Sequence, residues 1–185
     1  MKALKSLLTL ALSATVMTAA VAQKEATKMV GGAAMYPSKN IVANAVNSAD
    51  HTTLVAAVKA AGLVETLQSD GPFTVFAPTN AAFDKLPAGT VATLLKPENK
   101  GTLTAVLTYH VVAGKFDAKS ILKLIKDGKG KATLKTVQGG TLTATTDGKT
   151  VMLQDEKGGM STVTIADVFQ SNGVIHVIDS VVLPK

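Results

Sequence analysis

The 185-residue sequence is 46% hydrophobic and has a formal net charge of +6, and lysine is its only strongly basic residue type. Because arginine is absent, the chain lacks the forked side chain that recognises bases and phosphates in a bidentate manner, which argues against sequence-specific nucleic-acid binding. The absence of cysteine excludes a disulfide framework and a lipid-modified cysteine.

The N-terminal segment has the pattern of an export signal. Lys2 and Lys5 give it a basic start, an apolar run follows, and Ala20-Val21-Ala22 fits the small-x-small rule of signal peptidase. We therefore predict a signal peptide over 1–22 and no transmembrane span after its removal. The mature chain then has 17 lysines, 13 acidic residues and a net charge of +4. A retained anchor helix is the less favoured alternative, because the apolar run is short for a membrane span.

The residues after the signal are small and polar, so we predict a linker over 23–38 with Gly31-Gly32 as a breaker. About 160 mature residues suit one domain, which we place at 39–185. Helical spacing of apolar residues predicts a helix after the capping residue Asn40 and a second one that ends at Gly62.

The stretch 71–87 predicts a buried strand that turns sharply into a short helix. Phe73 begins the strand, and Pro78 ends it because proline has no N–H for a sheet ladder. Either of the next two residues can cap the helix with a side-chain oxygen. The residues that define this corner are Phe73, Phe76, Pro78, Thr79, Asn80 and Phe83.

Further short helices are predicted over 87–97, 98–108 and 118–125. Tyr109 and His110 precede two valines, and this composition favours a strand. We expect the strand to begin at Tyr109, so that the two side chains point to opposite faces deep in the domain and act first as scaffold.

From residue 132 the chain is rich in strand-forming residues. Asp147-Gly148 predicts a two-residue hairpin turn that pairs Leu142 with Leu153 and buries the apolar residues of both strands on one face. Asn172-Gly173 predicts another tight turn, followed by a long strand over 174–183.

Three segments together resemble the fasciclin domain family. They are FTVFAPTNAAF at 73–83, Tyr109-His110 leading into VVAGK, and NGVIHVIDSVVLP at 172–184. The resemblance covers about residues 39 to 184. It implies an α/β fold of the α+β type, a β-wedge of about seven strands flanked by several short helices. It also implies a non-enzymatic adhesion role. In animal relatives the Tyr-His segment is associated with integrin binding, and this carries over only to Tyr109 and His110.

Residues that could carry chemistry favour structural roles. His51, His110 and His176 are far apart and lack metal-binding spacing, so we expect no metal or cofactor. We expect His176 to be a hydrogen-bonded core histidine and Asp179 to be a buried, paired carboxylate on the opposite face of the last strand. Because strand neighbours point to alternate faces, His176, Asp179 and Ser180 cannot converge as a hydrolase triad, and we predict no enzyme activity.

Residues 115–135 hold seven lysines against two aspartates. A solvated helix face is the favoured interpretation, since arginine is absent. The alternative is a salt-sensitive patch for acidic polysaccharide or anionic cell surfaces that includes Lys123, Lys126 and Lys129.

Two classes of function remain for the exported chain, in the periplasm or at the cell exterior. The favoured one is an adhesion module that binds an extracellular or cell-surface protein or polysaccharide. The other is a secreted polysaccharide- or small-ligand-binding protein, which a large apolar cavity would favour. The sequence leaves the oligomeric state open.

Overall fold

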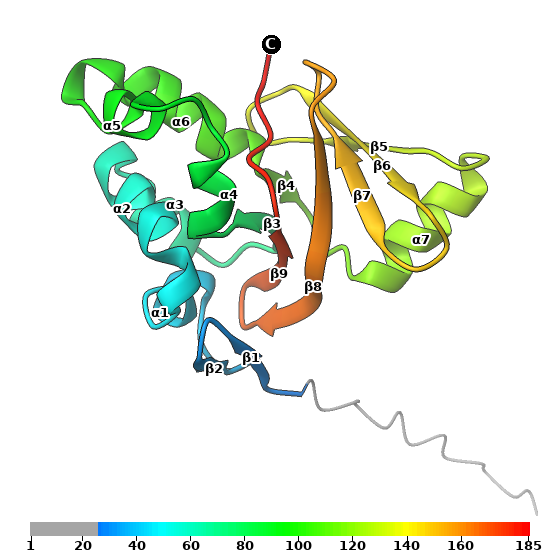
Figure 1. The fold of residues 1–185 in the computed structure, drawn as a ribbon. Helices are drawn as coiled ribbons and strands as arrows, with labels where there is room; N and C mark the ends of the chain where they lie inside the picture. Colours follow the sequence, from blue (N-terminus) through cyan, green and yellow to red (C-terminus); the bar gives the residue numbers. More distant parts are fainter. Residues whose placement is uncertain (1–25) are drawn as a thin grey trace, which may run out of the picture.

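A curved sheet of seven strands forms the middle of the structure, a computed structural model that describes residues 26–185 (Figure 1). The strands are β3 (Phe73–Pro78), β4 (Val111–Ala113), β5 (Ala132–Lys135), β6 (Thr141–Thr146), β7 (Val151–Gln154), β8 (Met160–Gln170) and β9 (Gly173–Ile178). Their order is β4-β3-β9-β8-β7-β6-β5, and β3 and β9 form the parallel pair. The predicted signal peptide, 1–22, lies outside the described residues.

The two ends of this sheet meet. Val112 of β4 forms an isolated bridge with Thr136, and the Val137 N–H donates to the Val111 carbonyl at 2.7 Å. The sheet is therefore nearly closed, and its concave face forms an interior that side chains can fill. Together with the helices, this confirms the predicted fold class.

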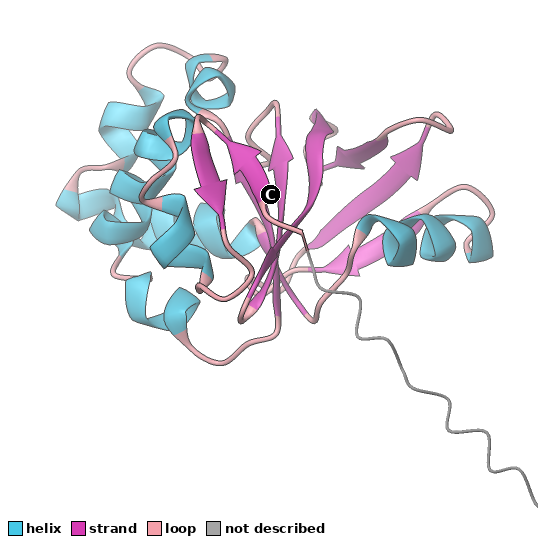
Figure 2. Ribbon diagram, turned by 90° about the horizontal axis from the view of Figure 1, so that it is seen from below, coloured by secondary structure: helices cyan, strands magenta, loops and turns pink. Residues whose placement is uncertain are grey.

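The helices divide unequally between the two ends of the sheet. They are α1 (Ile41–Ala45), η1 (Ala49–His51), α2 (Thr52–Ala61), α3 (Val64–Gln68), α4 (Asn80–Asp84), α5 (Thr90–Leu94), η2 (Pro97–Asn99), α6 (Lys100–Tyr109) and α7 (Ala118–Asp127). All except α7 gather on one side, whereas α7 lies beside β5 and β6 at the other end (Figures 1 and 2). Within residues 26–185, every helix is too short or too polar to span a bilayer.

Alternate residues of β3 and β9 supply two separate hydrophobic cores. Val75 and Val177 face the helices and belong to what we call the helix-side core. Phe76 and Ile178 face the other way, into what we call the sheet-side core, which also contains apolar residues of β5, β6, β7 and α7. The period of two along each strand thus produces the two layers.

The predicted linker is wrong over residues 28–35. These residues form the hairpin of β1 (Lys28–Val30) and β2 (Ala33–Met35), in which Val30 and Met35 are buried in the helix-side core. Gly31 and Gly32 adopt positive φ angles of 55° and 75° and form its turn. The glycines that suggest a chain break in the sequence therefore reverse the chain within an ordered element.

The β6–β7 hairpin has a four-residue loop, 147–150, instead of the predicted two-residue turn. Leu153 consequently faces Ala144 and not Leu142. The Asp147 carboxylate accepts hydrogen bonds from the N–H groups of residues 149 and 150, at 2.8 and 2.7 Å, which stabilises the wider loop. Because the register shifts by two residues, the predicted face is kept, and the apolar residues of both strands are buried together.

The second predicted turn is displaced by one residue. Gln170 pairs with Gly173, so the turn is Ser171-Asn172 and Gly173 already belongs to β9. A Cβ atom on Gly173 would lie 2.1 Å from the Phe73 carbonyl oxygen, so the close approach of β3 requires glycine. The last strand also ends earlier than predicted, at Ile178.

Candidate functional site

Tyr109 and His110 lie at the end of α6, which contradicts the strand predicted there. Tyr109 is the last residue of α6, His110 is its C-cap, and β4 begins at Val111. The two residues follow Val106 by three and four positions, so helical geometry continues the buried stripe of α6. Both are almost completely buried, with 0% and 2% of their surface exposed.

The hydroxyl group of Tyr109 links three parts of the fold. It donates a hydrogen bond to the Thr141 carbonyl at 2.6 Å and accepts one from the Glu156 N–H at 3.2 Å. Burial raises the pKa of Tyr109, although the hydrogen bond from Glu156 opposes the shift. The ring packs in the sheet-side core, so Tyr109 fastens α6 to β6 and to the turn between β7 and β8.

The ring of His110 is saturated with hydrogen bonds. Nε2 accepts from the Val182 N–H at 3.2 Å, so Nδ1 carries the proton of the neutral ring and donates to the Val106 carbonyl at 2.8 Å. Burial lowers the pKa of His110 to about 4, so the ring is neutral at pH 7. His110 thereby ties the end of α6 to the C-terminal segment.

His176 is similarly engaged, but in β9. Its Nδ1 accepts from the Asp167 N–H at 3.3 Å, and its Nε2 lies 2.8 Å from the Phe116 carbonyl oxygen. The ring stacks on Phe76 with 5.6 Å between centroids. Burial lowers the pKa of His176, which favours the neutral ring.

Asp179 follows β9 and is partly exposed, which corrects the expectation of a buried strand residue. Its Oδ1 accepts a hydrogen bond from the Thr162 N–H at 2.8 Å. The side chain thus satisfies a main-chain N–H just beyond the last paired residues of β8 and β9. Its Oδ2 lies 3.6 Å from the Lys85 ammonium group. Partial burial acts to raise the pKa of Asp179, but Thr162, Ser180 and Lys85 lower it below its ordinary value.

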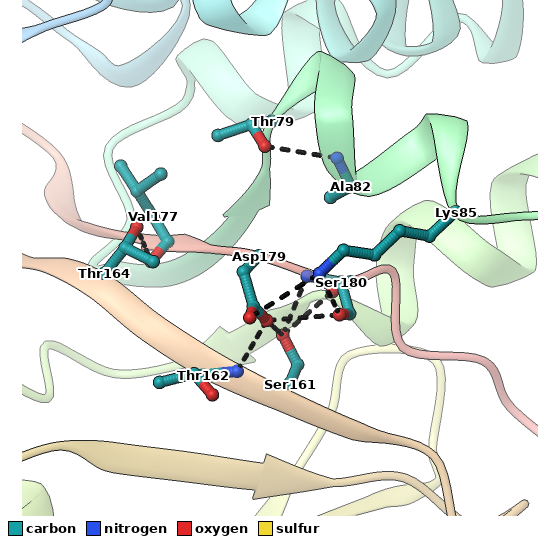
Figure 3. Close-up of polar contacts among 9 residues, drawn as sticks. All are labelled: Thr79, Ala82, Lys85, Ser161, Thr162, Thr164, Val177, Asp179 and Ser180. Carbon is teal, nitrogen blue, oxygen red and sulfur yellow. Dashed lines mark hydrogen bonds and ion pairs between the residues drawn. The ribbon is translucent and has the colours of Figure 1, made fainter.

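The polar cluster around Asp179 contains a serine beside a lysine, a pair that some hydrolases use. Lys85 donates to the Ser180 hydroxyl at 3.2 Å, and Ser161 completes the cluster (Figure 3). Lys85 is more than half exposed and lies at ion-pair distance from Asp179, whereas a lysine that serves as a catalytic base is desolvated in an apolar pocket. The geometry instead links the end of α4 to β8 and to the end of β9.

The histidines of the described residues are not part of a metal-binding cluster. Among residues 26–185, no group of three or more histidine, cysteine, aspartate or glutamate residues is arranged to hold a metal ion.

The corner after β3 is held by two different side chains. Thr79 caps α4, with its hydroxyl oxygen 3.2 Å from the Ala82 nitrogen (Figure 3). Asn80 instead reaches the preceding helices, where it accepts from the Thr53 N–H at 3.0 Å and donates to the Ala49 carbonyl at 2.9 Å. The sequence leaves the choice of cap open and does not indicate this second link.

Asn172 connects the β8–β9 turn to the helices. Its side-chain oxygen accepts from the Ile41 N–H at 3.0 Å, and its amide group donates to the carbonyls of Leu67 and Ser69, both at 2.8 Å. The side chain is buried, so each of these bonds satisfies a group that water does not reach.

The lysine-rich stretch 115–135 lies on α7, on β5 and in the loops around them. Lys123, Lys126 and Lys129 are exposed, and Lys123 forms an ion pair with Asp127 at 3.0 Å. Leu122 and Leu124 of α7 are also exposed. The predicted patch is therefore accessible, with one of its three charges partly neutralised.

An apolar cavity of about 90 Å³ lies in the helix-side core, and no sequence pattern indicated it. Side chains of α1, α2, α3, β3, β9 and the end of α6 line it, and most of them are aliphatic. His51 is also in the wall. Among the buried side-chain nitrogen and oxygen atoms of residues 26–185, its Nε2 alone has no hydrogen-bond partner.

Known proteins are similar to this chain over most of its length. The fasciclin domain family matches residues 49–184. Protein sll1483 of Synechocystis is 48% identical over 171 residues, which include 90% of this chain and 87% of that protein. The cell surface glycolipoprotein MPB83 of Mycobacterium bovis is 34% identical over 191 residues, with 93% of this chain and 79% of that protein covered.

A solved structure has the same fold. It is a FAS1 domain pair from the insect cell adhesion molecule fasciclin I, with a TM-score of 0.69 and 18% sequence identity. The similarity covers 78% of this chain and 51% of the domain pair, so this chain spans about half of that structure.

Proposed function

The chain belongs to the fasciclin domain family, and on this premise we propose that it is an adhesion or interaction module that acts outside the cytoplasm. The observation that carries the proposal is the similarity, over 93% of this chain, to a protein named for its place on the cell surface. The fold shared with an insect cell adhesion molecule agrees with it. The polar clusters described above hold the fold together, which supports a binding role over a catalytic one.

Attachment of protein-coated beads to cells tests this function. Beads carrying the full chain should attach to cells of the source species that lack the gene, more than beads carrying an unrelated protein of equal net charge. The matched charge removes non-specific attraction from the comparison. Equal attachment of both kinds of beads, with the chain shown to be folded, would contradict the adhesion role.

Export is a separate part of the proposal. It is supported by the basic start and the apolar run of the N-terminal segment. The intact mass of protein collected from the periplasm or medium should correspond to a chain that begins at Gln23. A mass that includes Met1 to Ala22 would indicate a retained anchor instead.

We assign the contact surface to the exposed lysines of the α7 region and a scaffold role to Tyr109 and His110. The side chains of Tyr109 and His110 are buried and hydrogen-bonded, so a partner cannot reach them in the folded domain. Tyr109→Phe and His110→Gln preserve the shape of each side chain and test this role. If both variants keep full stability but lose binding, the pair is a contact surface and the assignment is wrong.

The lysine surface is tested with alginate, an anionic polysaccharide, and with dextran as its neutral counterpart. The full chain should bind immobilised alginate but not dextran, and its affinity should fall steeply with added salt because exposed charges are screened. The combined substitution of Lys123, Lys126 and Lys129 by Gln should abolish this binding without lowering the thermal midpoint.

A control with the same loss of charge comes from the opposite end of the molecule. Lys59, Lys96 and Lys100 are exposed on or beside α2 and α6, and their substitution by Gln should leave most of the alginate binding intact. Equal losses in the two triple variants would indicate attraction by net charge alone. Binding unaffected by either would leave the α7 lysines as a solvated face.

A further inference from the structure

The cavity in the helix-side core is enclosed mainly by hydrocarbon side chains. Its wall includes Ile41, Leu54, Val58, Leu107, Val168 and Ile175, all of them buried and aliphatic. An apolar cavity offers water too few hydrogen-bond partners, so cavities of this kind stay dry and take up small apolar molecules. The wall atoms lack packing partners on the empty side, and an apolar occupant would supply those contacts.

The polar side chains of the wall are bonded elsewhere or closed off from the space. The Thr108 hydroxyl donates to the Thr104 carbonyl at 2.7 Å, and both ring nitrogens of His110 are bonded. Ser48 bonds to Nδ1 of His51, and Nε2 of His51 has practically no accessible surface. A polar group on an occupant would therefore lose its hydrogen bonds to water without replacement, which favours an occupant that has none.

The wall extends to the molecular surface. Lys59 and Thr66 are exposed, and Val137 has 48% of its surface exposed, although all three line the cavity. A lysine at such a position keeps its ammonium group in water while its aliphatic stem covers apolar surface. A small molecule therefore has a route from solvent into the cavity.

The volume of the cavity limits the size of the occupant. An engineered apolar cavity of roughly 150 Å³ takes up benzene. The cavity of about 90 Å³ in this chain is smaller, and in proportion it suits a molecule of about four carbon atoms. A larger molecule would have to displace side chains of the wall, which carries the cost of overpacking.

We propose that the helix-side cavity is a binding site for a small hydrocarbon without polar groups, a short alkene or alkane of about four carbon atoms. This role is independent of adhesion through the α7 lysines, because the cavity lies among α1, α2, α3 and β3, away from α7. Failure of either proposal therefore leaves the other intact.

Isobutene and acetone are matched probes, because acetone has a carbonyl oxygen where isobutene has a methylene group. Binding to the folded full chain is followed by the NMR resonances of isoleucine methyl groups. Isobutene should shift the resonances of Ile41 and Ile175, which line the cavity, with half-saturation on the order of 1 mM. The resonances of Ile121 and Ile125 in the sheet-side core should stay in place. Acetone should bind about tenfold more weakly or worse, because its oxygen finds no donor in the cavity.

A pair of variants on α1 places the binding in the cavity. Ala45 lines the cavity and is only half-buried, so Ala45→Leu can extend into the space with little strain and should weaken isobutene binding about tenfold or more. Ala43 is equally half-buried on α1 but does not line the cavity, and Ala43→Leu should leave the affinity unchanged. Unaltered methyl resonances of the sheet-side core show that both variants are folded.

Each other outcome overturns part or all of the inference. If isobutene leaves the resonances of Ile41 and Ile175 unchanged in the folded chain, the cavity is not a binding site. Equal affinities for isobutene and acetone would remove the assigned preference for a molecule without polar groups. Equal shifts in the two cores, or an equal loss of affinity in the Ala43 and Ala45 variants, would place the probe outside the cavity.

Discussion

The two cores share β3 and β9 but differ in how completely they are filled and bonded. In the sheet-side core, side chains such as Phe76, Leu142 and Leu153 have no exposed surface, and the polar group of Tyr109 is fully engaged. The helix-side core contains the cavity and the unpartnered nitrogen of His51.

The difference follows from the elements that build each side. The nearly closed sheet surrounds its interior with regularly spaced strands, so alternate side chains meet from several directions. On the helix side, α1 and α3 have only five residues each, so each helix presents a short apolar face with few regularly spaced side chains. Close packing is therefore more difficult to reach there, and space remains.

Removal of the tyrosine ring should produce the largest effect. Tyr109→Ala should destabilise the domain by about 3–5 kcal/mol, because it removes a fully buried ring from a filled core. Tyr36 is 45% exposed, and Tyr36→Ala should cost less than about 1 kcal/mol. Chemical denaturation of both variants measures the contrast. A small loss for Tyr109→Ala would mean that the sheet-side core can rearrange.

A leucine in each core provides a closer comparison. Leu153→Ala should cost about 4 kcal/mol, whereas Leu54→Ala should cost about 2–3 kcal/mol, both within the range known for leucine truncations. Leu153 is enclosed by the sheet-side core, whereas Leu54 borders the cavity, so part of the Leu54 surface already faces empty space. Equal free energies of unfolding for the two variants would show that the cavity does not loosen its surroundings.

Alternation predicted much of the sheet-side core. Leu142, Ala144 and Leu153 are on the expected face because any even shift of register preserves that face. The loop length was not predictable from Asp147-Gly148 alone, because the Asp147 side chain bonds to two N–H groups and stabilises the longer loop. The hydrogen bonds of the Asp147 side chain thus determine the length of the loop, which the hydrophobic pattern does not specify.

The candidate sites were less accessible to sequence reasoning. The aromatic and β-branched residues from Tyr109 to Val112 favour a strand, but the buried stripe and the hydrogen bonds of α6 continue through Tyr109. Helical spacing identifies the inward face of α1 and α2 but not how well that face fits β3. The cavity and the open nitrogen of His51 therefore emerge only from the packed structure.

The pH dependence of stability should reflect how deeply His110 is buried. Its native pKa of about 4 lies below the unfolded value of 6.5, so the unfolded chain binds a proton first as the pH falls. The contribution is complete above pH 6.5 and is lost between 6.5 and 4, about 3 kcal/mol in all. His110→Gln should flatten the curve of unfolding free energy against pH in this window.

His51→Gln is the comparison within the helix-side core. Burial lowers the pKa of His51 in the same direction, but the Ala77 carbonyl and Asp50 oppose the shift. Its substitution should flatten the curve less than His110→Gln does. If His110→Gln leaves the slope of unfolding free energy against pH unchanged, the His110 ring of the unmodified chain takes up its proton near pH 6.5 even in the native state.

The smallest expected effect concerns the same two histidines at constant pH. His110→Phe leaves the Val182 N–H and the Val106 carbonyl without their partner, and both lie in the interior, so it should cost about 1–3 kcal/mol. His51→Phe removes an atom that has no partner and breaks only the bond to Ser48. Its cost should stay below about 1 kcal/mol, and the further change Ser48→Ala should reduce it, since no buried hydroxyl then remains unpaired. Denaturation of the three variants at pH 7 measures these differences. If His51→Phe is as costly as His110→Phe, Nε2 has a partner in solution, and the helix-side core is as fully bonded as the sheet-side core.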